Sequence, residues 1–527
     1  MKTRLIISIY AWLCCSAVAI AQDYALCNQY TEIGDFVKAK QCLYAYKGVN
    51  DPGALCFYKM NLAINEGDGA SAKALYAESE RLTATDPYVL GTKAIYVAYS
   101  NNAEAAKVVF DPIYKSHKNV SPVFLMEVVR AFFKFKSKDL QYASAWIDML
   151  EKEIKQPNAD WLILKGDYFA SQGDHGTALN FYNKAIDADS KKATAYHRKG
   201  IAYRRIKNHA ASMTELETAL KLNPEFTMAI LNKAEVHFDL GEIDLGMRAY
   251  ADYFNRAPED MRARIQYARS LFSAKRFKDS EEAALFVLGR DSSNLAALKL
   301  LSYSNYELGK FSDGLKHMES FLSKADSSLI QSRDYEYLSK YYQKNNSDSL
   351  AINALRKALA YEDADAGLYS DAGSLMMKKN RFADAFEVFK TKAAKFPLTS
   401  ADNYSYGRAA LMLQNYSTAD SIFSKVCEVQ PNWAPGFLMK AKASTYLDPE
   451  SKDGRAFPYY EKYIALASAD TANPDKYKSG LIESYRYMGS YYYLLKNDKT
   501  TSKDFWKKLL ILDPNDKQAK EVLEGLK

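Results

Sequence analysis

The chain has 527 residues, 48% of them apolar and 26% charged, with a formal charge of +7 from 71 basic and 64 acidic side chains. With 23 glycines and 14 prolines, this composition excludes a collagen-like or largely disordered chain and is that of a folded protein. Basic and acidic residues are interspersed without a long basic run, which argues against a nucleic-acid-binding protein.

The first residues predict an export signal. Lys2 and Arg4 precede an apolar stretch at residues 5–20, and residues 19–21 are Ala-Ile-Ala, the pattern of a cleavage site. We therefore predict that residues 1–21 are a secretory signal peptide. An uncleaved anchor is the alternative, although the apolar stretch is shorter than the ~20 residues that span a membrane. No later apolar run reaches that length, so we expect no transmembrane segment in the mature chain.

Residues 22–158 are predicted to form divergent helical repeats. Segments 32–46 and 65–79 each begin with a polar turn around a glycine and continue as a helix with small and large residues on one face. Each such turn and helix would be the second half of a helical hairpin.

A strict period appears in residues 159–331. Small residues recur every 34 positions in a first helix, namely Gly166, Gly200, Ala234, Ala268 and Ser302. A second series with the same period marks a second helix, namely Ala178, Ser212, Gly246, Ser280 and Gly314. Large side chains lie three or four positions from these residues and therefore share their helix face. The pattern predicts consecutive helical hairpins in which small residues, such as the facing pair Gly200 and Ser212, let two helices approach closely.

The period resumes after a three-residue insertion and continues through residues 332–433, where proline again closes the units. Residues 434–527 are predicted to contain divergent repeats and a polar capping helix at 517–527. We count about 14 hairpins, which predicts an all-α fold of the α-α superhelix type, a solenoid in which each repeat contacts its neighbours.

These residues resemble the tetratricopeptide repeat, a 34-residue helix-turn-helix unit. Residues 163–189, ILKGDYFASQGDHGTALNFYNKAIDAD, are the best copy, although Lys165 and Lys199 stand where the family often has leucine. The resemblance implies a solenoid whose first helices line a concave groove that binds a partner polypeptide. Carried over by position, the candidate groove residues are His197, Arg198, Arg205, Leu231, Asn232, Glu235, Phe238, Arg262, Gln266, Arg269 and Phe272.

The family's lysine–asparagine clamp for a terminal carboxylate is not reproduced, because Ile201 occupies a position that would need asparagine. We therefore do not expect binding of chaperone tails. Arginine and aromatic side chains in the groove would suit a partner with carboxylates and apolar side chains. A solvated helix face is the alternative interpretation of these arginines.

The register of the first repeat also predicts a disulfide. With Gly34 at the turn, Cys27 lies at the small position of the first helix, and Cys42 lies on the face of the second helix that meets it. An exported protein meets an oxidising compartment, so we predict a Cys27–Cys42 bridge with Cys56 left over. Zinc is the rival interpretation, but no CxxC motif and no nearby histidine accompany these cysteines.

No catalytic motif or phosphate-binding glycine loop is present, so we expect no enzyme activity and no cofactor or metal. The favoured hypothesis is a scaffold or adaptor in an envelope protein assembly, periplasmic or peripheral to the outer membrane of a Gram-negative bacterium. One alternative is a glycan- or nutrient-binding partner of an outer-membrane transporter, in which Tyr491, Tyr492 and Tyr493 would contact the ligand. An enzyme with an unfamiliar site is the third hypothesis.

Overall fold

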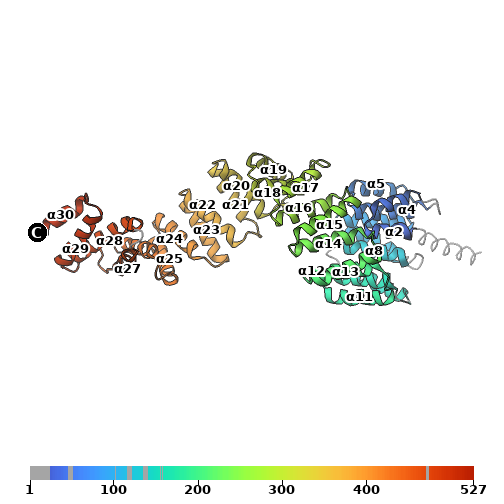
Figure 1. Cartoon of the computed structure of the whole chain (residues 1–527), viewed down its shortest axis with the longest axis horizontal. Helices are drawn as coiled ribbons and strands as arrows, with labels where there is room; N and C mark the ends of the chain where they lie inside the picture. The colour runs from blue at the N-terminus through green and yellow to red at the C-terminus, as the bar shows by residue number, and fades with distance from the viewer. Residues whose placement is uncertain are drawn as a thin grey trace, which may run out of the picture. The chain divides into compact units, whose positions relative to one another are not determined.

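The computed structural model of the protein describes residues 24–45, 51–100, 103–115, 122–134, 140–154, 156, 158–470 and 474–526. Within these residues the chain forms 29 α-helices, a short 3-10 helix and no β-strand, which confirms the predicted all-α fold (Figure 1). No helix in this part of the chain has the length and apolar character needed to cross a membrane. The predicted signal peptide at residues 1–21 lies outside the described residues.

The chain divides into two compact units, Met1–Ser304 and Asn305–Lys527. The boundary falls within helix α18 (Leu295–Glu307). The first unit contains the helices α2 (Ala25–Ile33), α3 (Phe36–Ala45), α4 (Pro52–Glu66), α5 (Gly69–Ser79), α6 (Pro87–Tyr99), α7 (Ala103–Lys115), α8 (Pro122–Lys134), α9 (Leu140–Glu153), α10 (Ala159–Ser171), α11 (His175–Ala188), α12 (Ala193–Arg205), α13 (His209–Leu222), α14 (Thr227–Asp239), α15 (Ile243–Arg256), α16 (Met261–Ser273) and α17 (Phe277–Leu288).

The second unit continues with the same kind of helix. Its members are α19 (Phe311–Lys324), η2 (Ser327–Leu329), α20 (Ser332–Lys344), α21 (Asp348–Leu359), α22 (Ala366–Lys378), α23 (Phe382–Lys395), α24 (Ser400–Met412), α25 (Tyr416–Val429), α26 (Ala434–Leu447), α27 (Phe457–Ala469), α28 (Pro474–Leu494), α29 (Lys499–Leu512) and α30 (Lys517–Gly525). The 3-10 helix η2 lies in the segment where the sequence predicted an insertion.

Successive helices pack as hairpins, for example α10 with α11, α12 with α13 and α20 with α21. A residue in the left-handed conformation ends the first helix of a pair, as at Gly173 with φ 83° and Lys207 with φ 60°. In the α10–α11 hairpin the second helix also begins with a side-chain cap, because the Asp174 carboxylate accepts a hydrogen bond of 2.9 Å from the Thr177 N–H. Local turn chemistry therefore sets where this hairpin folds back.

The small residues lie where the two helices of a hairpin cross. The Ser212 hydroxyl donates a hydrogen bond of 2.8 Å to the Gly200 carbonyl, which confirms the predicted facing pair. A Cβ atom at Gly200 would lie 2.9 Å from Cγ of Leu216, a fully buried side chain of the second helix. Glycine is thus required at position 200 because Leu216, 16 positions later in the sequence, packs directly on its backbone.

The first unit also brings distant repeats together. Helix α2 packs against α14, although nearly 200 residues separate them, and Figure 1 shows the blue helices beside the green ones. Gly34, at the turn after α2, faces Met228 at the start of α14, where an added Cβ would lie 2.6 Å from the Met228 Cγ. The first hairpin and the seventh hairpin of this unit are therefore neighbours in space.

Candidate functional site

Three candidate residues and two of their neighbours, five residues in all, form one hydrogen-bonded chain between α12 and α14. Nε2 of His197 lies 2.7 Å from Oδ1 of Asn232, and the Asn232 amide donates a bond of 3.0 Å to Glu235. Glu235 in turn pairs with Arg204, which also donates a bond of 2.5 Å to Asp239. Because these groups pair with one another across the two helices, they fix α12 and α14 side by side.

His197 is a buried residue of this chain, with 2% of its surface exposed. Burial and the neighbouring Arg198 lower the pKa of His197 to about 3, so the imidazole is neutral at physiological pH. Its ring lies 4.6 Å from the ring of Phe226, centroid to centroid. His197 therefore acts as a packing residue and a hydrogen-bonding partner of Asn232.

Three further candidates are also engaged inside the protein. Nε of Arg198 lies 3.2 Å from Oδ1 of Asp167 on α10, and Leu231 is 8% exposed. The Phe238 ring lies 5.8 Å from the ring of Tyr250, in an edge-to-face arrangement. The Arg198 contact joins neighbouring repeats, whereas the Phe238 contact lies within the α14–α15 hairpin. These candidate side chains are therefore engaged in contacts within the protein.

The third set of candidates lies on α16. The guanidinium of Arg262 donates a hydrogen bond to the carbonyl of Asn65, in the second hairpin. Gln266 is half-buried, and Phe272 is half-buried with its ring 5.3 Å from that of Phe277. Arg269, by contrast, is exposed.

Arg205 and Arg269 stand apart from the other candidates. Both are exposed, and neither has a carboxylate within 4.0 Å among the residues that the structure describes. They occupy the first helices α12 and α16, two repeats apart. Most of the candidate residues therefore contact other parts of the protein, whereas the guanidinium groups of Arg205 and Arg269 face solvent.

A charged cluster that sequence reasoning missed joins α2 to α8. Arg130 pairs with Glu127 at 2.6 Å and with Glu32 of the first hairpin, and the three side chains are only 11–18% exposed. Burial raises the pKa of Glu127 above its ordinary value, and Glu32 adds to the effect while Arg130 opposes it. The sequence carried no signal for this cluster, because nothing in it indicates that the first and fourth hairpins meet.

A protein-family model of the tetratricopeptide repeat matches residues 160–192 and 193–226. The chain is also 31% identical to the C-terminal part of a TPR repeat-containing protein from Cytophaga hutchinsonii, over 49% of this chain and 98% of that one, with a TM-score of 0.38. This chain is a tetratricopeptide-repeat protein. The matched residues are the α10–α11 and α12–α13 hairpins, the region where the sequence showed its best copies.

Two further solved structures are similar to this tetratricopeptide-repeat chain at lower identity. A tetratricopeptide repeat protein from Parabacteroides merdae is 16% identical, over 48% of this chain and 98% of that one, with a TM-score of 0.37. PilW, a type IV pilus biogenesis factor, is also 16% identical, over 38% of this chain and 92% of that one, with a TM-score of 0.34. A comparison with curated proteins finds no match.

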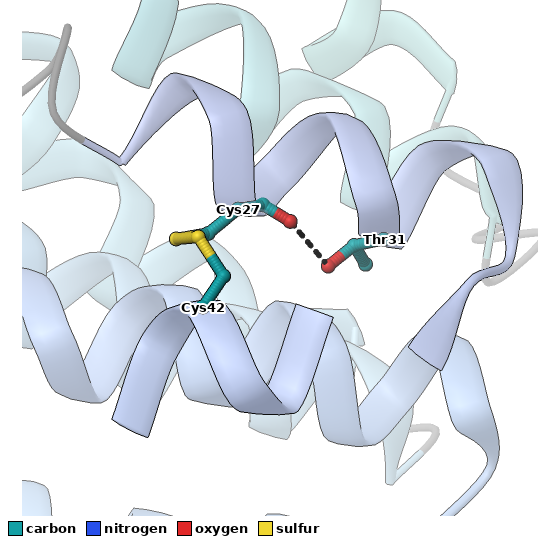
Figure 2. Close-up of a disulfide and its surroundings, with 3 residues drawn as sticks. All are labelled: Cys27, Thr31 and Cys42. Atoms are coloured by element: carbon teal, nitrogen blue, oxygen red, sulfur yellow. Dashed lines mark hydrogen bonds between the residues drawn. A yellow bond between two sulfur atoms is a disulfide. The ribbon is translucent and has the colours of Figure 1, made fainter. Parts of the chain in front are cut away.

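The first hairpin holds the two cysteines for which the sequence predicted a disulfide. Cys27 of α2 and Cys42 of α3 are bonded to each other, with their Cα atoms 5.4 Å apart (Figure 2). The Thr31 hydroxyl donates a hydrogen bond of 3.3 Å to the Cys27 carbonyl, one turn back along α2. Cys56 is buried and free, and burial raises the pKa of its thiol to about 11, so it is not a reactive thiolate.

The tyrosine triplet near the end of the repeat array does not form one exposed platform. The Tyr491 ring packs 4.7 Å from that of Phe457, and the Tyr492 ring packs 5.7 Å from that of Phe505, centroid to centroid. Only Tyr493 is substantially exposed, at 40%. Helical geometry explains the difference, because three consecutive residues of one helix point in three directions.

The second unit has a polar hollow of about 440 Å³ beside α20 and the start of α22. Its charged groups are engaged locally: Lys340 pairs with Glu336 at 2.6 Å, and Asp363 accepts a hydrogen bond of 3.1 Å from the Ser332 N–H. Within the described residues no group of three or more metal-ligating side chains is found. This hollow is therefore a polar depression in the surface, and its described side chains do not indicate a particular cofactor.

Proposed function

We propose that this protein is a non-catalytic scaffold or adaptor that binds a partner polypeptide through the first helices of its central repeats. The observation that carries this proposal is the pair of exposed guanidinium groups of Arg205 and Arg269, which have no carboxylate partner among the described residues. A guanidinium binds carboxylates in a bidentate geometry, so a partner segment rich in aspartate or glutamate would complement them.

The engaged residues around the two arginines support the same proposal in a different way. His197, Asn232 and Glu235 are fixed by mutual hydrogen bonds, so α12, which carries Arg205, and α14 are held together before any partner arrives. A preordered surface loses little conformational entropy on binding, which favours affinity per unit of contact area.

We further propose that the protein is exported and works in an envelope assembly, in the periplasm or at the periphery of the outer membrane of a Gram-negative bacterium. The basic and apolar pattern of residues 1–21 supports export. A bridge between Cys27 and Cys42 suits an oxidising compartment, since such bonds are rare where glutathione keeps thiols reduced. Fractionation of cells that make the full chain tests the location directly.

Affinity capture from crosslinked envelopes tests the function. The bait is the full-length protein, compared with the double variant Arg205→Glu/Arg269→Glu and with Arg248→Glu as a matched control. Arg248 is an exposed arginine on the second helix α15, so the control makes the same charge change away from the proposed wall. We expect a stoichiometric protein partner with the wild type and the control, and at least about a tenfold loss with the double variant. Equal capture by all three baits, or no partner at all, contradicts the proposal.

Glycan binding is the alternative function, and the ring packing of Tyr491 and Tyr492 gives it less support. Calorimetry with envelope oligosaccharides tests it. Heat of binding that disappears in Tyr493→Ala, the variant of the exposed tyrosine, would favour the alternative over the scaffold.

A further inference from the structure

Two neighbouring first helices of the second unit carry the same banded pattern of side chains. Each has a large apolar residue, a cation and a second large apolar residue at intervals of four, namely Tyr404, Arg408 and Met412 in α24 and Leu438, Lys442 and Tyr446 in α26. Residues four apart lie on one face of a helix, about 6 Å apart along its axis. Because α24 packs against α26 and the two sets are 34 residues apart, they form a basic row between two apolar rows. We call these six residues the banded face.

The apolar row at the ends of the two helices is exposed. Met412 is 57% exposed and Tyr446 is 56% exposed. The Tyr446 ring stacks on that of Tyr416 at the start of α25, with the centroids 4.5 Å apart, so the protein holds the ring from one side. The next first helix, α28, also ends in an exposed apolar residue, Leu494. Exposed apolar side chains gathered on neighbouring helices mark an interaction surface, whereas single ones do not.

The basic row carries a positive charge without a partner inside the protein. Arg408 is exposed and has no carboxylate within 4.0 Å among the described residues, and its guanidinium lies 5.9 Å from the centroid of the Tyr404 ring. Nζ of Lys442, by contrast, lies 2.8 Å from a carboxylate oxygen of Glu483. Burial raises the pKa of Tyr404 while Arg408 and Lys442 both oppose the rise, so both cations lie near that ring. The charge available to a ligand is therefore that of Arg408.

The order of the rows limits the chemistry of a ligand. It needs a carboxylate for the guanidinium of Arg408 and an apolar group about 6 Å away on each side. An α-helix meets this need, because its residues i, i+4 and i+8 lie on one face at the same spacing as the rows. A phospholipid has its apolar chains on one side of its charged group only. A membrane surface would therefore match one apolar row and not both.

We propose that the banded face is a second partner-binding surface, which takes an amphipathic helix with an acidic residue one turn away from a large apolar residue on each side. Such a helix lies along α24 and α26, with its carboxylate on Arg408 and its apolar side chains on the two apolar rows. This inference rests on the proposed scaffold function, because that function supplies the partner. Its test uses synthetic peptides and the second unit, so its failure is distinguishable from failure of the arginine pair in the first unit.

Fluorescence anisotropy with the full-length protein and stapled helical peptides tests the match. Three peptides share one sequence and differ only at positions i, i+4 and i+8, which are Leu-Glu-Leu, Leu-Lys-Leu or Ala-Glu-Ala. We expect the Leu-Glu-Leu peptide to bind at least about tenfold more tightly than the other two. Equal affinities, or no saturable binding of the Leu-Glu-Leu peptide, overturn the proposal. Binding to phosphatidylglycerol vesicles that Arg408→Glu abolishes, without a preference among the peptides, overturns it in favour of a membrane.

Substitutions of exposed residues locate the bound peptide. Arg408→Glu should weaken binding of the Leu-Glu-Leu peptide about tenfold and transfer the preference to Leu-Lys-Leu, and this new preference also shows that the variant folds. Met412→Ser should weaken binding about fivefold, because it removes one apolar contact. Lys425→Glu and Val429→Ser are the matched controls, since they make similar changes at exposed positions of the second helix α25. Both controls should bind as the wild type does, and wild-type affinity in Arg408→Glu contradicts the proposal.

The double variant Arg205→Glu/Arg269→Glu separates this surface from the one proposed in the first unit. It should bind the Leu-Glu-Leu peptide with the affinity of the wild type, because both of its substitutions lie on α12 and α16. Loss of peptide binding in this double variant would assign the peptide to the first unit and overturn the inference.

Discussion

Replacing Gly166 by alanine should destabilise the fifth hairpin, although alanine is the better helix former. Gly166 lies in α10, where an added Cβ would stand within 2.6 Å of two ring atoms of Tyr182 on α11. The Tyr182 ring cannot move aside easily, because it is 2% exposed and its hydroxyl donates a hydrogen bond of 2.8 Å to Asp167. The substitution therefore forces either the ring or the two helix axes to shift.

The magnitude follows from two opposing terms. Alanine gains about 1 kcal/mol of helix propensity over glycine in a helix interior. Overpacking of a well-filled core costs about 1–3 kcal/mol, and the anchored ring of Tyr182 puts this site at the upper end. We expect a net loss of about 2 kcal/mol for Gly166→Ala. Gly176→Ala in the paired helix α11 is the matched control, since its nearest neighbour is its own capping residue Asp174 at 3.7 Å.

Native-state hydrogen exchange is the suitable assay, because long repeat arrays do not unfold in one all-or-none step. A loss of about 2 kcal/mol corresponds to about 30-fold faster exchange of the protected amides in α10 and α11. The control should exchange at the wild-type rate or more slowly. If Gly166→Ala proves as protected as Gly176→Ala, close packing of the large residue on the glycine is not what requires the glycine.

Three further predictions concern buried groups. Lys392→Met should lower the local free energy of opening of α23 and α24 by about 3–5 kcal/mol, measured by native-state hydrogen exchange, because it leaves Asp402 buried without its ion-pair partner at 2.7 Å. Burial opposes ionisation of Asp402, yet hydrogen bonds from Lys392 and others hold its pKa below the ordinary value, so the stabilisation is present above about pH 4 and is lost as the pH falls further. Because burial lowers the pKa of His197 to about 3, the local stability of α12 and α14 should fall by up to about 1.4 kcal/mol per pH unit below about pH 6.5. His197→Gln should remove that slope in native-state hydrogen exchange at several pH values. Non-reducing peptide mapping should recover Cys27 linked to Cys42, and free thiols at both positions would contradict the bridge.

Repeat position predicted which helices carry the candidate residues, but it did not predict which of them are buried. Repeat position placed His197 and Arg269 in one set, because both lie on first helices at positions that the resemblance assigns to the groove. The structure separates them, since His197 is buried against Asn232 while Arg269 faces solvent. Repeat position fixes which helix face a residue occupies, but its burial depends on which neighbouring side chains are long enough to cover it.

The sequence by itself determined the helical hairpin and its length, because glycine, serine and alanine at 34-residue intervals are needed wherever a large side chain packs on the opposing helix. It also indicated Cys27 and Cys42 as neighbours, since both lie within one hairpin and local register relates them. Only the tertiary structure decided that α2 meets α8 and α14. That contact depends on how small rotations between successive repeats add up over about seven hairpins. No single repeat encodes the sum, so Glu32 and Met228 carry no local sign of their role.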